Sequence, residues 1–347
     1  MSRAVDYAPL TSDVTRADVR ALKQAQGSGS GVAPAVLLAV VGGIIAVIAF
    51  VAAGGVGVLA GQSSPSRLLP VGIVVLIGAG IAAGGVLGSQ GRWRDFVRLD
   101  RFARANGLVF RASDPAPAYS GAIFGRGGSR TVSPHLMAAS GRFTEIGNYE
   151  YTTGSGKNRR THRWGFAVVR LDRRLPHMVL DSRANNSFLG TNLPVAFDRD
   201  QVLSLEGDFD RHFTLYCPRE YETDALYVFT PDLMALLIDE ASPFDVEIVD
   251  DWMFVYSTNP FVLTQPAVWD RLLRIVDLVG VKMVQRTERY RDERVAPTTA
   301  ASALAGALPD VVAPQGRRLR RGFPVAAVVI VVIVVVGWIA LSSGLLR

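Results

Sequence analysis

Cysteine is nearly absent from this sequence, since Cys217 is the only one among 347 residues. A single thiol cannot form an intrachain disulfide, so a fold held together by disulfides is excluded. The composition is instead typical of a protein in a reducing compartment. Cys217 ends a predicted strand, where a lone cysteine more often behaves as a small buried hydrophobe than as a nucleophile.

Histidine is also scarce, with four in the chain. None of them forms an H-E-x-x-H pair, and His212 and Cys217 lie five residues apart, which places them on opposite faces of a strand. The segment GRGGSR (125–130) lacks the G-x-x-x-x-G-K-[ST] spacing of a phosphate loop, so its arginines are expected to decorate a turn. The sequence therefore predicts no catalytic residue, no metal and no cofactor.

Ionisable side chains are missing from three long apolar runs, residues 32–61, 68–91 and 322–346. A helix that crosses a hydrocarbon core of about 30 Å needs roughly 20 residues. All three runs are long enough. We therefore expect three transmembrane α-helices, the first two as an N-terminal helical hairpin and the third as a single C-terminal span.

Arginines stand next to two of these runs. They are the candidate contacts with anionic lipid: Arg92, Arg94, Arg317, Arg318, Arg320 and Arg321. Because positive charges beside a span tend to remain in the cytoplasm, they predict a cytoplasmic N-terminus and central domain, with the C-terminus outside. Lysine occurs only three times, which suggests a GC-rich bacterial genome. The expected localisation is therefore multi-pass, in the bacterial cytoplasmic (inner) membrane.

The central region has the pattern of an α+β cytoplasmic domain over residues 92–290, long enough to bury a substantial core. The expected elements are strands at 141–154 and 159–172 joined by a turn, short strands at 177–182, 201–207 and 212–218, helices at 219–230 and 231–241, a hairpin at 244–257 turning at Asp250 and Asp251, and an amphipathic helix at 266–290. Residues 1–31 are expected to be a flexible cytoplasmic N-terminus, and residues 291–321 a flexible linker with a basic cluster. Residues 322–347 would hold the last span and a short tail.

Charge is divided unevenly within that domain. Residues 92–183 contain 17 basic and 7 acidic side chains, and residues 184–290 contain 8 basic and 18 acidic ones. The basic half could lie against anionic lipid, or the two halves could pair their charges within one fold. The acidic clusters are expected to be solvated surface: Glu206, Asp208 and Asp210, and Asp245, Glu247, Asp250 and Asp251.

Residues 213–257, from FTLYCPREYETD to FDVEIVDDWMFVYS, resemble the core of an uncharacterised bacterial family of membrane-anchored domains. In that family an F-x-x-Y strand precedes an acidic helix, a T-P helix and a hairpin. The resemblance implies an anchored cytoplasmic domain and no activity, cofactor or catalytic residue.

The functional hypothesis is an integral membrane protein whose cytoplasmic domain is a non-enzymatic interaction or scaffold module. Its expected partners are the lipid bilayer and another protein or a second copy of the chain, with no nucleic acid. One alternative is an enzyme acting on a lipid-linked or membrane-proximal substrate, with a pocket that joins two or more of Asp181, His177, His212 and the acidic clusters. A second alternative is an accessory subunit of a transport assembly.

Overall fold

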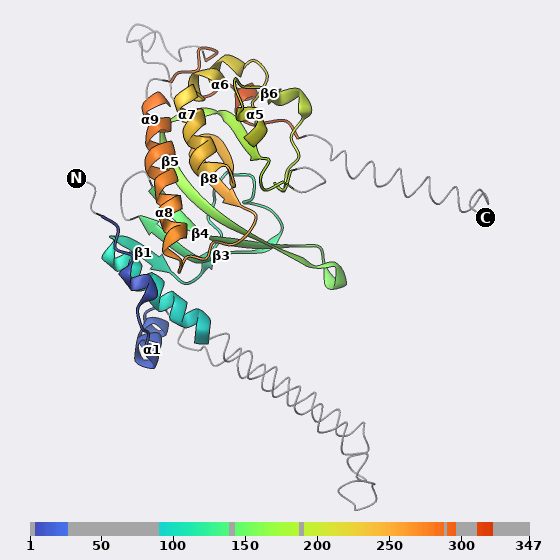
Figure 1. The fold of residues 1–347 in the computed structure, drawn as a ribbon. Helices are drawn as coiled ribbons and strands as arrows, with labels where there is room; N and C mark the ends of the chain where they lie inside the picture. Colours follow the sequence, from blue (N-terminus) through green and yellow to red (C-terminus); the bar gives the residue numbers. More distant parts are fainter. Residues whose placement is uncertain are drawn as a thin grey trace, which may run out of the picture. The chain divides into compact units, whose positions relative to one another are not determined.

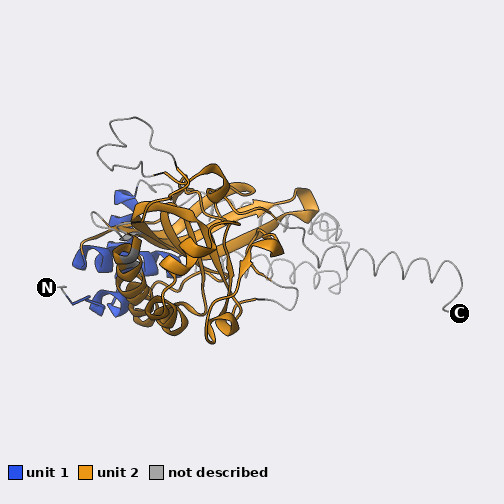
Figure 2. Ribbon diagram, turned by 90° about the horizontal axis from the view of Figure 1, so that it is seen from above, with its two compact units in different colours: residues 1–106 blue, residues 107–347 orange. Residues whose placement is uncertain are grey.

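The computed structural model describes residues 4–26, 90–138, 143–186, 191–287, 290–295 and 311–321. The chain divides into two compact units, residues 1–106 and 107–347, which Figure 2 colours blue and orange. The domain boundaries predicted from the sequence composition stay predictions.

The first unit contains helix α1 (Arg16–Ala25) and a second helix described over residues 90–105. A capping box begins α1: the Thr15 hydroxyl accepts from the Asp18 N–H, and the Asp18 carboxylate accepts from the Thr15 N–H. Asp18 also forms an ion pair of 2.9 Å with Arg101 of the second helix. The apolar side chains Phe96, Val97 and Phe102 of the second helix are buried.

The second unit is built on an antiparallel sheet that has eight strands in the described residues. The strands are β1 (Leu108–Arg111), β2 (Asp114–Pro115), β3 (Gly128–Ala138), β4 (Phe143–Thr153), β5 (Arg160–Ser182), β6 (Val202–Leu203), β7 (Phe213–Tyr216) and β8 (Asp245–Ser257). Their order is β1-β3-β4-β5-β7-β6, with β2 on β3 and β8 on β5. The long strand β5 therefore lies at the centre, where it curves through Figure 1.

Strand β8 corrects the predicted hairpin at Asp250 and Asp251. The chain does not turn back there but continues as one strand that pairs with β5 at both ends, from Gly165↔Ser257 to Leu180↔Val246. Asp250 has a φ of +55° and faces Leu175, where the register shifts. The two aspartates thus mark a β-bulge, which bends a strand without ending it.

Helices cover one face of the sheet. They are α6 (Glu222–Val228), α7 (Pro231–Leu236), α8 (Pro266–Arg274) and α9 (Val281–Thr287), with π-helical turns at Leu237–Ala241 and Ile275–Gly280. In Figure 1, α8 and α9 follow one another end to end in front of the sheet with α7 beside them, and α9 contacts β5. The amphipathic helix predicted at 266–290 corresponds to α8, the second π-helical turn and α9, and its apolar residues Leu272, Ile275, Val279 and Met283 are buried. The α+β class of the central domain is confirmed.

Three segments outside the long strands pack on the sheet: residues 116–127, residues 191–198 and residues 311–321. Phe124, Phe197 and Leu319, one from each segment, pack in a buried cluster with Phe166 and Phe254 of the sheet. We call residues 311–321 the strap.

The prediction of three transmembrane helices is corrected. Among the described residues, no helix is both long enough and apolar enough to cross a membrane. The helical stretch from Pro266 to Thr287, for example, carries Asp270, Arg274 and Lys282. The predicted spans 32–61 and 322–346, and all of 68–91 except its last two residues, lie outside the described part of the chain. The structure supports an α+β fold and does not support the multi-pass inner-membrane localisation that depended on those spans.

Candidate functional site

The second unit contains a cavity of about 730 Å³ beside the strap. Residues 120–127 form one wall, Pro194, Val195 and Phe197 another, and the strap supplies Arg318, Leu319 and Arg321. Tyr151, His162, His177 and Glu247 line it from strands β4, β5 and β8. This volume is typical of a small-molecule site.

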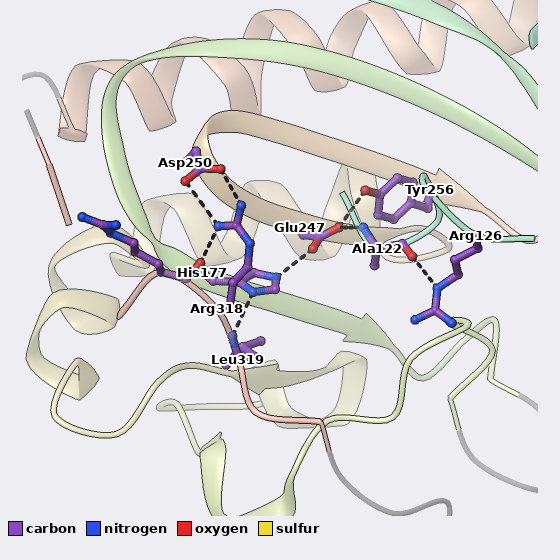
Figure 3. Close-up of polar contacts among 9 residues, drawn as sticks. Ala122, Arg126, His177, Glu247, Asp250, Tyr256, Arg318 and Leu319 are labelled. Atoms are coloured by element: carbon purple, nitrogen blue, oxygen red, sulfur yellow. Dashed lines mark hydrogen bonds and ion pairs between the residues drawn. The ribbon is translucent and has the colours of Figure 1, made fainter. Parts of the chain in front are cut away.

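A buried carboxylate, Glu247, organises this cavity (Figure 3). Glu247 is 1% exposed and accepts hydrogen bonds from the Ala122 N–H at 2.6 Å and the Tyr256 hydroxyl at 2.7 Å. Burial raises the pKa of Tyr256 well above its usual value, so the hydroxyl keeps the proton that it donates. Glu247 thereby fixes residues 120–127 to the sheet.

His177 connects this carboxylate to the strap. Its Nε2 lies 2.7 Å from Glu247 Oε1, and the Leu319 N–H donates to its Nδ1 at 3.0 Å. Because a backbone N–H can only donate, Nδ1 accepts and the ring proton lies on Nε2, which donates to Glu247. Both ring nitrogens are therefore occupied, and His177 cannot act as a general base while Leu319 is in place.

Hydrogen bonds along its length fasten the strap to the domain. Arg318 binds the Asp250 carboxylate with two bonds of 2.8 and 3.2 Å, and this carboxylate sits on the bulge of β8. Gln201 binds the backbone of Arg320 through both its amide oxygen and its amide nitrogen. The Ala313 N–H donates to Asp292 at 2.9 Å. The strap lies within the linker predicted at 291–321, and its residues Arg318, Leu319 and Arg321 form one wall of the cavity.

Arginine side chains give the cavity a positive lining. Arg126 donates through Nε to the Ala122 carbonyl at 3.0 Å. Burial lowers the pKa of Arg126, and the positive charge of Arg321 lowers it further. Among the described residues that line the cavity, Glu247 is the only acid, and three hydrogen bonds already occupy its oxygens. Arg126 and Arg321 thus face a space that favours an anion.

A second buried histidine–glutamate pair lies outside this cavity. His135 Nδ1 is 2.6 Å from Glu145, and the Tyr119 hydroxyl donates to the other Glu145 oxygen at 2.8 Å. Both His135 and Glu145 are 3% exposed. Tyr119 belongs to the 116–127 segment, so two buried carboxylates, Glu145 and Glu247, hold that segment on the sheet.

Two further carboxylates, Asp181 and Asp245, are buried near each other on β5 and β8. Asp245 accepts the Ser182 N–H at 2.8 Å, and Asp181 accepts the Thr191 hydroxyl at 2.9 Å. Burial raises the pKa of Asp245 to about 7; the Ser182 hydrogen bond opposes this rise, and the charge of Asp181 adds to it. Burial likewise raises the pKa of Asp181.

The prediction that the acidic clusters are solvated surface is partly wrong. Asp245 and Glu247 are 0% and 1% exposed, so the expectation that they are solvated surface is wrong. Glu206 and Asp208 are exposed, as expected. Among the residues proposed for an enzymatic pocket, only His177 and Glu247 meet at the cavity. Asp181 lies near Asp245 instead, and neither Asp181 nor His212 lines the cavity. In the described residues, no group of three metal-ligating side chains converges.

The six arginines predicted to contact anionic lipid fall into two groups. Arg92 and Arg94 are exposed on the helix at 90–105 of the first unit. The other four lie on the strap, where Arg318 and Arg321 line the cavity, Arg320 is bound through its backbone, and Arg317 donates to the Val312 carbonyl. Whether any of them contacts lipid stays a prediction. Cys217 is buried, as predicted, and this burial raises its thiol pKa to about 12.

Comparisons with known proteins do not identify a family for this chain. No family model matches the chain, and no curated protein matches it. A solved structure, the crystal structure of the mycobacterial trehalose monomycolate transport factor A, aligns with 12% identity over 62% of this chain and 96% of that one. Its TM-score of 0.33 is too low to show a shared fold. The resemblance of residues 213–257 to a membrane-anchored family therefore stays a prediction.

Proposed function

We propose that the second unit binds a small anionic ligand with an apolar portion in the cavity beside the strap. The observation that carries this proposal is the pair Arg126 and Arg321, two positive side chains at a cavity. Among its described lining residues the one acid, Glu247, already accepts three hydrogen bonds. Phosphate and carboxylate groups are the partners that guanidinium groups bind best, through paired N–H donors.

The remaining walls define the other part of the ligand. Phe124, Val195 and Phe197 are buried residues that line the cavity together with Leu319. Apolar surface of this kind favours a hydrocarbon or aromatic portion, while the arginines fix the position of the charge. A ligand with both features matches this cavity better than a fully hydrated inorganic ion.

The hydrogen bonds of His177 favour binding over catalysis. A general base needs a free lone pair within reach of the substrate, and both nitrogens of His177 are taken. This agrees with the hypothesis of a non-enzymatic module. The hypotheses of a protein partner or second copy, and of an accessory subunit in a transport assembly, stay predictions.

Removing the Arg126 charge is expected to weaken ligand binding. The probe is 1-naphthyl phosphate, with 1-naphthol as its uncharged analogue, titrated calorimetrically into the full chain. Arg126→Met keeps most of the aliphatic stem, and we expect the affinity for 1-naphthyl phosphate to fall about tenfold or more because a charge-assisted contact is lost.

Arg130→Met is the matched control, because Arg130 lies four residues away, is exposed and does not line the cavity. Its affinity should change less than about twofold, since an exposed charge outside the site is well screened. Equal binding of 1-naphthol and 1-naphthyl phosphate, or equal losses in the two variants, would show that the cavity does not select an anion.

A further inference from the structure

The first unit carries its own cluster of positive charge. Its described residues, 4–26 and 90–106, contain eight basic and five acidic side chains. Three arginines of the second helix form ion pairs: Arg98 with Asp95, Arg101 with Asp18 and Arg104 with Asp100. The other five basic residues have no ion pair with a carboxylate of the described residues: Arg16, Arg20, Lys23, Arg92 and Arg94.

Four of these five residues converge on one groove. Arg16, Arg20 and Lys23 recur every three or four residues along α1 and therefore share one of its faces. Together with Arg94 they line a cavity of about 340 Å³ whose other lining residues are Val19 and Gln90. The Lys23 ammonium also lies 5.1 Å from the centre of the Trp93 ring, which holds the two helices' side chains together at this groove.

No carboxylate is among the described residues that line this groove. Residues 27–89, which join α1 to the second helix, contain Arg67 and no aspartate or glutamate. Asp6 of the same unit binds the Ala8 N–H, and Asp18 is already paired with Arg101. Four like charges that line one groove with no carboxylate among the lining residues repel one another, so an anion bound among them would be stabilised.

We propose that this groove binds the phosphate group of a phosphate-bearing ligand. Guanidinium groups bind phosphate oxygens through paired donors, and an ammonium group adds a point charge. The chemistry is shared by a soluble polyphosphate and by a phospholipid headgroup. The site lies wholly in the first unit and does not depend on the ligand proposed for the second.

The test measures binding of three probes to the full chain immobilised on a resin: inorganic tripolyphosphate, dihexanoyl phosphatidic acid and dihexanoyl phosphatidylcholine. The two phosphate-rich probes should bind, and the phosphatidylcholine, whose headgroup has no net charge, should bind at least about tenfold more weakly. Tighter binding of tripolyphosphate would identify a soluble ligand, and tighter binding of phosphatidic acid a lipid headgroup.

Arg94→Glu should weaken binding of the anionic probes about tenfold, and Arg94→Gln by a smaller factor because it adds no repulsion. The control, Arg104→Glu, makes the same charge change on the same helix at a side chain that is 73% exposed and already paired with Asp100. Its effect should be less than about twofold. Equal losses in Arg94→Glu and Arg104→Glu, or wild-type binding no stronger than that of phosphatidylcholine, would overturn the proposal.

Discussion

Glu247→Leu is expected to lower the free energy of unfolding of the second unit by about 4 kcal/mol. The substitution removes the acceptor for three buried donors, the Ala122 N–H, the Tyr256 hydroxyl and His177 Nε2. A buried polar group left without a partner costs about 1–3 kcal/mol, so three such losses far exceed the apolar gain from leucine. Hydrogen exchange of the amides in β5 and β8 would measure the change.

Two further variants distinguish the stability lost with these hydrogen bonds from the stability lost when any glutamate is replaced. Glu247→Gln keeps the shape and one acceptor oxygen, so its loss should be intermediate. Glu150→Leu, on β4, removes a carboxylate that is 42% exposed and paired with Arg163, and should cost less than about 1 kcal/mol. A loss below about 1 kcal/mol for Glu247→Leu would contradict the role of Glu247 in holding residues 120–127 on the sheet.

Asp245→Asn is expected to stabilise the protein at pH 8 but not at pH 4. In the folded state the pKa of Asp245 is about 7, above its ordinary value of 3.8. The folded state therefore holds this proton more tightly than the unfolded state. The resulting stability is fully present below pH 3.8 and is lost as pH rises through 7, a change of up to about 4 kcal/mol. Asparagine carries no charge and escapes this loss.

The measurement is urea denaturation of the wild type and the variant from pH 4 to pH 8. The stability difference in favour of Asp245→Asn should grow with pH and level off above pH 7. Asp239→Asn replaces an exposed aspartate on a neighbouring element and should give a difference that does not depend on pH. A pH-independent difference for Asp245→Asn as well would show that Asp245 is ionised in the folded protein across this range.

Much of the fold could be predicted from local patterns. The turn at 155–158, the start of α7 at Pro231 and the apolar face from Leu272 to Met283 depend on residues close in sequence. The uninterrupted course of β8 through Asp250 and Asp251 could not be predicted, because two adjacent aspartates are as typical of a turn as of a bulge. Only the pairing of β8 with β5 across both sides of the bulge decides between them.

The candidate site could not be predicted, because it is assembled from distant segments. His177 lies 70 residues from Glu247 and 142 from Leu319, and neither separation leaves a local motif. One signal was available: Asp245 and Glu247 alternate with Val246 and Ile248 in a strand whose two faces are both mostly apolar. Acidic residues in such a strand are more often buried and hydrogen-bonded than solvated.

The arginine cluster of the strap shows how the structure changes the interpretation of a charge run. In the sequence, Arg317, Arg318, Arg320 and Arg321 indicated the inner end of a membrane span. In the structure, Arg318 is paired with Asp250, and Arg321 faces Phe197 in a backbone bridge at the cavity. The cluster thus has a role within the second unit that requires no span.

The most direct test of the anion-binding cavity is a crystal structure of the full chain grown with 1-naphthyl phosphate. We expect the phosphate oxygens to lie about 3 Å from the guanidinium nitrogens of Arg126 and Arg321, with the naphthyl ring against Phe124 and Phe197. A ligand bound with its phosphate away from both arginines, or a cavity that stays empty at saturating ligand, would contradict the proposal.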